Sequence, residues 1–87
     1  MSEYIVTSNL IGSYESLAPY REDHLNYLTR LKNSGNLQMG GRFTDGKGGL
    51  YIVIAGSDEE AEALVKGDPY HVNNLREFTI RQWERKI

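Results

Sequence analysis

The sequence predicts an α+β domain whose elements follow the order strand, helix, strand, strand, helix, strand. Four short segments are rich in β-branched and aromatic residues, and two longer ones carry apolar residues at spacings of three and four. At 87 residues the chain can bury one modest core but not two. We therefore expect a single domain over residues 1–87. Because the chain has no cysteine, packing alone must stabilise it.

The first strand is expected at Glu3–Asn9, where aromatic and β-branched residues follow no helical period. A turn at residues 12–13 ends it. From Ser16 onward an apolar stripe indicates a helix, which has Pro19 in its first turn and ends at residues 34–36. The residues of this stripe are Leu17, Tyr20, His24, Leu28 and Leu31.

The middle of the chain predicts a β-hairpin. Its strands are Leu37–Phe43 and Gly49–Gly56, and the intervening loop contains an Asp-Gly step and further glycines that tolerate positive φ. The second strand is apolar on both faces. Tyr51, Val53 and Ala55 point to one side, and Leu50, Ile52 and Ile54 point to the other.

A second helix is expected after the capping box at Ser57–Glu60, and it ends at Gly67. Asp68 and Pro69 then favour a short helical or turn segment through Leu75, because Asp is a common N-cap and Pro a common first helical residue. The last strand alternates over residues 77–83, with Phe78, Ile80 and Gln82 on one face and Thr79, Arg81 and Trp83 on the other.

This order of elements predicts a ferredoxin-like arrangement, an antiparallel sheet with both helices on one face. Right-handed crossovers place the two helices on the same side, which leaves the other face of the sheet bare. Because the strand at residues 49–56 is apolar on both faces, that bare face also requires burial. We therefore expect a second copy to pack sheet against sheet, giving a homodimer or a higher homo-oligomer.

The charge of the chain bears on its partners. A net charge of −2 and a pI near 5.6 provide no basic field for phosphates, so nucleic acid is disfavoured and a small neutral or anionic ligand or another protein fits better. An RNA-recognition motif is also rejected, because Gly49 and Ile54 stand where aromatic side chains should stack on bases. The longest apolar run, Leu50–Ala55, is too short for a membrane span, and we expect a cytoplasmic protein.

Two residues are the main candidates for chemistry. His24 lies in the apolar stripe of the first helix, so its imidazole should point toward the sheet, where a histidine is more often a hydrogen-bonded core residue than a catalyst. Asp68 is explained equally well as a helix N-cap. If its free oxygen also reached His24, the carboxylate would fix the imidazole tautomer, as a general acid or base requires. Sequence spacing leaves that contact open.

Other candidates are weaker. Gly40 and Gly41 interrupt a strand, which more often indicates a bulge than a ligand that approaches the backbone. Arg42 beside them could bind a carboxylate, although a surface arginine on a strand is commoner. The two histidines are widely separated and no phosphate-binding glycine loop is present, so we expect no metal site and no cofactor. His71 should lie on the exposed side of its turn.

Three segments together resemble the YciI-related family. They are a helix bearing His-Leu, a glycine-rich second strand, and an Asp-Pro-Tyr after the second helix, and they occur here as Arg21–Leu28 (REDHLNYL), Gly35–Gly41 (GNLQMGG) and Ala61–Tyr70 (AEALVKGDPY). The resemblance implies a ferredoxin-like fold that pairs into a dimeric α/β barrel similar to muconolactone isomerases. It also implies a pocket with a histidine and an aspartate, which become His24 and Asp68 here, and it adds Tyr70 to the substrate-binding candidates.

One departure from the family pattern affects the pocket. Gly40-Gly41-Arg42 stands where the family usually has Ala-Gly-Pro, so the shape or charge of that wall differs. Family members are linked to dehalogenation or isomerisation of ring-derived compounds, but one fold hosts many functions. The leading hypothesis is an acid/base enzyme acting through His24 and Asp68 on a small cyclic or unsaturated carbonyl compound. The alternative is a dimer that binds a small molecule or another protein without catalysis.

Overall fold

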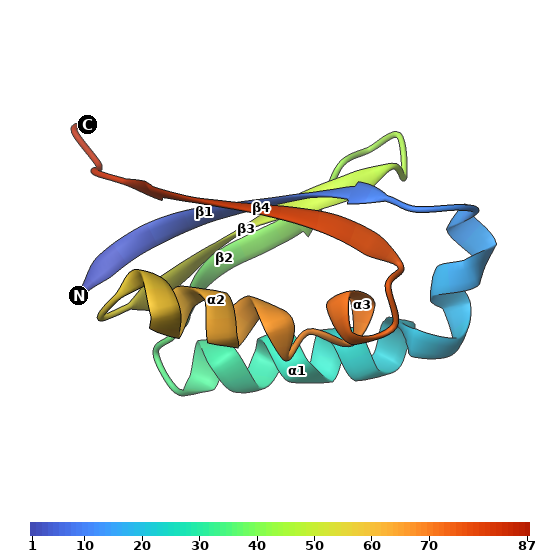
Figure 1. The fold of residues 1–87 in the computed structure, drawn as a ribbon, viewed down its shortest axis with the longest axis horizontal. Helices are drawn as coiled ribbons and strands as arrows, with labels where there is room; N and C mark the ends of the chain where they lie inside the picture. Colours follow the sequence, from blue (N-terminus) through green and yellow to red (C-terminus); the bar gives the residue numbers. More distant parts are fainter.

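Four strands and the helices between them account for most of the chain. The computed structural model describes all residues 1–87. The elements, in chain order, are β1 (Ser2–Leu10), a 3-10 helix (Tyr14–Tyr20), α1 (Arg21–Asn33), β2 (Leu37–Arg42), β3 (Gly48–Ala55), α2 (Asp58–Lys66), α3 (Pro69–Val72) and β4 (Arg76–Trp83). All helices lie on one side of the sheet, as Figure 1 shows. The expected α+β, ferredoxin-like fold is confirmed.

The sheet has the order β2-β3-β1-β4, and every neighbouring pair is antiparallel. Tyr4 lies opposite Val53 and Val6 opposite Tyr51 on the helix side, whereas Ile5 lies opposite Ile52 on the other side. The predicted alternation of side chains in β3 is therefore confirmed. In β4 the register also places Phe78, Ile80 and Gln82 on the helix side.

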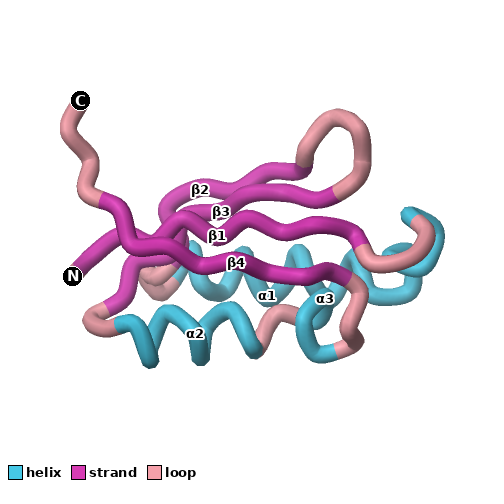
Figure 2. The backbone as a smooth tube through the Cα atoms, turned by 45° about the horizontal axis from the view of Figure 1, so that its top comes forward, coloured by secondary structure: helices cyan, strands magenta, loops and turns pink.

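The hydrophobic core fills the space between the sheet and the helices. Its nine buried residues come from every strand except β4 and from both long helices: Tyr4, Val6, Leu31, Leu37, Tyr51, Val53, Ala55, Ala61 and Val65. Helices α1 and α2 run side by side beneath the sheet (Figures 1 and 2). The Tyr27 hydroxyl of α1 donates a hydrogen bond of 2.6 Å to the Leu64 carbonyl of α2, which joins the two helices directly.

The predicted helix caps are present. The Ser57 hydroxyl accepts a hydrogen bond from the Glu60 backbone N–H at 3.1 Å, and a Glu60 carboxylate oxygen accepts one from the Gly56 N–H at 3.2 Å. At α3, Pro69 occupies the first turn, and Asp68 accepts a hydrogen bond from the Tyr70 N–H at 2.9 Å. These caps fix where α2 and α3 begin, and the second of them positions Asp68.

The predicted start of the first helix was wrong. The chain forms a 3-10 helix over Tyr14–Tyr20, and the α-helix begins only at Arg21. Pro19 lies inside the 3-10 segment, where it has no N–H to donate and its ring disfavours α conformation at Ala18. The tighter 3-10 turn therefore carries the chain past the proline.

The predicted position of the bulge also needs correction. The irregularity in the pairing of β2 with β3 falls between Leu37 and Met39, ahead of the two glycines, which pair regularly. Gly40 is required for space instead, because a Cβ atom there would lie only 2.9 Å from the Tyr51 Cβ atom on β3. A Cβ atom at Gly41 would meet nothing within 4 Å. The absence of a side chain at Gly40 therefore leaves room for Tyr51.

No helix covers the second face of the sheet, which we call the outer face (Figures 1 and 2). Its central side chains are Ile5, Leu50, Ile52 and Ile54, as the strand register requires. Met39 and Trp83 are among the exposed large apolar residues of the chain, 51% and 39% exposed. None of the helices is long and apolar enough to cross a membrane.

Candidate functional site

The site is built around Asp68, the N-cap of α3. Its side chain is completely buried, and both of its oxygens accept hydrogen bonds. Oδ1 accepts from the backbone N–H of Tyr70 at 2.9 Å and from Nδ1 of His24 at 2.7 Å, and Oδ2 accepts from the Tyr51 hydroxyl at 3.1 Å. A buried carboxylate with three donors is well satisfied and holds its partners in fixed positions.

Gly67 brings this carboxylate close to α1. A Cβ atom at Gly67 would collide with the Tyr27 hydroxyl, so glycine lets the chain pass this close to the first helix without displacing Tyr27. The next residue then reaches His24, which lies 44 positions earlier in the sequence. The contact that the sequence left open is therefore present in the fold.

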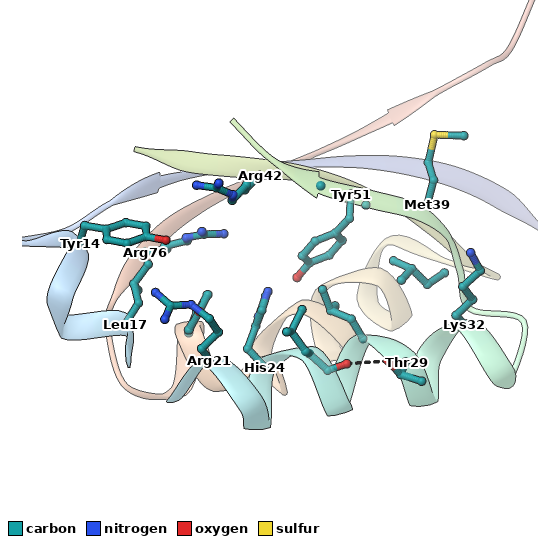
Figure 3. Close-up of a pocket in the computed structure, with 16 residues that line it drawn as sticks. Tyr14, Leu17, Arg21, His24, Thr29, Lys32, Met39, Arg42, Tyr51 and Arg76 are labelled. Carbon is teal, nitrogen blue, oxygen red and sulfur yellow. Dashed lines mark hydrogen bonds between the residues drawn. The ribbon is translucent and has the colours of Figure 1, made fainter. Parts of the chain in front are cut away.

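His24 is held on two sides and points toward a cavity. Its ring stacks on that of Tyr70, with centroids 3.9 Å apart and planes 9° from parallel. Because the carboxylate accepts at Nδ1, the neutral imidazole carries its proton there and keeps a lone pair on Nε2. Nε2 lies at the end of the ring away from the backbone, and that end points into the cavity (Figure 3).

The cavity has a volume of about 600 Å³ and lies between the sheet, α1 and the 3-10 helix. Half of the lining residues are hydrophobic, among them Leu17, Leu28 and Leu37. His24 is 7% exposed and Tyr51 is 5% exposed, and both line the cavity, whereas Asp68 lies behind them. A cavity that combines apolar walls with convergent polar groups is the usual form of a small-molecule site.

Tyr51 is a member of the site that sequence reasoning missed. Burial, and then the neighbouring Asp68 carboxylate, raise the pKa of its hydroxyl far above the ordinary value, so that Tyr51 stays protonated and donates to Asp68. The sequence placed its side chain on one face of β3 but gave no signal for the hydrogen bond. Alternation in a strand predicts which face of the sheet a side chain points to, but it does not predict the hydrogen-bond partners of that side chain.

The other predicted residues lie around the same cavity. Gly40, Gly41, Arg42 and Tyr70 all line it. Burial raises the pKa of the Tyr70 hydroxyl, although the nearby Arg21 and Arg76 guanidinium groups act in the opposite direction. His71 is exposed and lies outside this group, as expected.

Arg21 and Arg76 are further lining residues that the sequence did not single out. Burial lowers the pKa of the Arg76 guanidinium group, which is 9% exposed. Nothing in the local sequence of Arg76 indicates an inward position, because it is the first residue of a half-solvated strand. The basic character of the cavity comes from residues on three different elements.

Comparisons with known proteins agree with the fold. The family model of the YCII-related domain matches residues 2–84 of this chain. The uncharacterized protein YjpA of Bacillus subtilis (strain 168) is 38% identical over 63 residues, which are 72% of this chain and 74% of that protein.

A solved structure has the same fold. It is the 5-chloro-2-hydroxyhydroquinone dehydrochlorinase TftG of Burkholderia phenoliruptrix AC1100, in complex with 2,5-dihydroxybenzoquinone. The TM-score is 0.84, the sequences are 24% identical, and the match covers 97% of this chain and 95% of the dehydrochlorinase. The family that Arg21–Leu28 and the other two segments suggested is confirmed, and this chain belongs to the YCII-related domain family.

Proposed function

We propose that this protein is a small acid/base enzyme in which His24 transfers a proton on a cyclic or unsaturated carbonyl compound. One observation carries the proposal: Nδ1 of His24 lies 2.7 Å from a buried carboxylate while the opposite end of the ring points into a cavity of about 600 Å³. A base needs a free lone pair, a fixed tautomer and room for substrate, and His24 has all three.

In the proposed reaction, Nε2 of His24 takes a proton from the carbon next to a carbonyl group. The electron pair of the broken C–H bond then forms the C=C bond of an enolate. In an isomerisation, the imidazolium returns the proton to a different carbon. In an elimination, the enolate electrons expel a leaving group such as chloride from the neighbouring carbon, and the imidazolium later loses its proton to water.

Asp68 is a positioning residue in this proposal. Its carboxylate stabilises the imidazolium that forms when Nε2 accepts the proton, and it keeps Nδ1 protonated in the resting state. Tyr51 and the Tyr70 N–H in turn hold the carboxylate, and the Tyr70 ring holds the imidazole plane. The similar dehydrochlorinase supports chemistry of this class, since loss of HCl from a ring begins or ends with such a proton transfer.

We also propose that two copies pair through the outer face. Half-buried Ile5, Leu50 and Ile54 form an apolar strip along the two central strands, and no element of the chain covers it. Contiguous apolar surface of this kind on a small domain commonly marks a protein interface. Such pairing would leave the cavity free, because the cavity lies on the helix side of the sheet.

The test of the catalytic proposal is proton exchange in D₂O. The protein is incubated with a panel of cyclohexenones, unsaturated lactones and chlorinated hydroquinones, and NMR follows deuterium uptake next to the carbonyl as well as product formation. Exchange is visible even where the equilibrium does not favour a product. We expect His24→Gln to reduce exchange by about 10²–10⁴-fold, which is the usual contribution of a general base.

His71→Gln is the control, because that histidine is exposed and lies outside the cavity. It should exchange at the parent rate. Equal exchange by the parent and His24→Gln would refute the base assignment. Tight ligand binding without any exchange would favour the alternative, a dimer that binds a metabolite without turnover.

A further inference from the structure

The cavity is strongly basic although the chain is not. Four of its lining residues are cationic, namely Arg21, Lys32, Arg42 and Arg76, and none is acidic. The whole chain carries a formal charge of −2. The fold therefore concentrates positive charge around this cavity and keeps acidic side chains out of its lining.

Three of these cations gather at one end. In Figure 3, Arg21, Arg42 and Arg76 lie together beside Tyr14, while Lys32 and Met39 lie at the other end and His24 lies between them. The three arginines come from α1, β2 and β4. We call this group the arginine end of the cavity.

None of these arginines has a carboxylate partner within the chain. The ion pairs of the structure are His24 with Asp68, Arg85 with Glu3, and Lys86 with Glu84. Asp68, the nearest acidic side chain in the site, already accepts from three donors. Like charges held together without counterions repel one another, and an anion between them would remove that repulsion.

Arg76 shows the lack of a partner most clearly. It is 9% exposed, its Nε is buried without any hydrogen-bond partner, and its one hydrogen bond runs from Nη1 to the Ser8 hydroxyl at 3.4 Å. A buried charged group usually has its donors satisfied, because an unsatisfied one is costly. The Arg76 guanidinium group therefore lacks a strong acceptor within the chain.

Aromatic rings contact two of the guanidinium groups. The Arg76 guanidinium carbon lies 4.7 Å from the centre of the Tyr70 ring, and that of Arg21 lies 5.2 Å from the centre of the Tyr14 ring. A guanidinium group that stacks on a ring keeps the N–H bonds at its edge for hydrogen bonding. Those edges match the two oxygens of a carboxylate.

We propose that the arginine end binds a carboxylate of the substrate, so that the substrate is an unsaturated or ring carboxylic acid whose reacting carbon lies against His24. This inference rests on the proposed function for the reaction and adds the class of substrate. Arg76 binds the carboxylate from behind, and Arg21 and Arg42 bind it from the sides. The apolar walls contact the ring, and the carboxylate fixes which ring carbon reaches Nε2.

The test compares two probes of one shape and different charge by isothermal titration calorimetry. The probes are 2,5-dihydroxybenzoate and 2,5-dihydroxybenzamide, and each is titrated at pH 7 in low salt and in 0.5 M NaCl. We expect the acid to bind about 10- to 100-fold more tightly than the amide, because charge-assisted hydrogen bonds are stronger than neutral ones. High salt should reduce this difference.

Variants locate the effect. Arg21→Gln and Arg42→Gln should each weaken binding of the acid by about tenfold and leave binding of the amide unchanged. Arg30→Gln is the matched control. Arg30 is an exposed arginine that lies on α1, like Arg21, but does not line the cavity. Arg76→Lys keeps the charge but loses the two-pronged geometry, and it should also weaken acid binding.

The inference would be overturned by equal affinity of acid and amide, by Arg42→Gln and Arg21→Gln variants that bind the acid like the parent, or by no binding of either probe at millimolar concentration. Phenyl phosphate serves as the third probe, and clearly tighter binding of it than of the acid would overturn the carboxylate assignment. His24→Gln should still bind the acid. If the catalytic proposal fails, binding of the acid measured by calorimetry should still be seen. If the acid and the amide bind equally, deuterium exchange on neutral carbonyl compounds can still be seen, so the two failures are distinguishable.

Discussion

Replacing Asp68 tests whether this carboxylate organises the site or only caps a short helix. Asp68→Ala removes the acceptor of three buried donors, which are His24 Nδ1, the Tyr51 hydroxyl and the Tyr70 N–H. Each buried donor that loses its partner costs about 1–3 kcal/mol. Removing the buried charge returns part of that cost. We therefore expect Asp68→Ala to lower the free energy of unfolding by about 3–6 kcal/mol, which is much of the stability of a small domain.

Asp68→Asn separates geometry from charge. The amide oxygen can still accept from His24 and Tyr70, and the Tyr51 hydroxyl can rotate to accept from the amide nitrogen. Only the difference between charged and neutral hydrogen bonds is lost, so we expect a destabilisation of about 1–2 kcal/mol. Proton exchange should nevertheless fall strongly, since the amide cannot stabilise the imidazolium.

The assay is urea denaturation at pH 7, followed by far-UV circular dichroism. Ser57→Ala is the control, because Ser57 caps α2 through one exposed hydrogen bond and its loss should cost about 1 kcal/mol. If Asp68→Ala cost no more than Ser57→Ala, Asp68 would be an ordinary cap and the description of a shared network would be refuted.

Two further predictions concern pH and assembly. Because the pKa of Tyr51 is raised in the folded state, its contribution to stability is fully present below its unfolded pKa of about 10 and declines as the pH rises above that value. Above pH 10, the free energy of unfolding of Tyr51→Phe should therefore fall less steeply with pH than that of the parent, and the two slopes should differ by about 1.4 kcal/mol per pH unit. Equal slopes of the two proteins in urea titrations from pH 10 to 11.5 would contradict this. Leu50→Lys places a charge in the outer face and should convert a dimer into a monomer with unchanged circular dichroism; sedimentation velocity measures this, and a parent that sediments as a monomer at 50 µM would refute pairing.

The sequence by itself determined most of the local structure. Alternation located the last strand and its two faces, and the capping residues located the second helix and the start of α3. Asp68 was predicted as an N-cap because an Asp-Pro step has that preference wherever it occurs. These features depend on residues within a few positions of one another. The error at the start of α1 arose because Pro19 was placed in an α-helical turn when it lies in a 3-10 helix.

The tertiary structure alone decided how the site is composed. His24 and Asp68 are 44 residues apart, and their contact depends on how closely α3 approaches α1, which the space at Gly67 permits. Tyr51 joins them because Gly40 leaves room for it on the neighbouring strand. The arginine end could not be foreseen from a net charge of −2, because a sum of charges contains no positions. Side-chain hydrogen bonds and electrostatic interactions depend on distances in space, and the fold brings residues that are distant in the sequence within reach of one another.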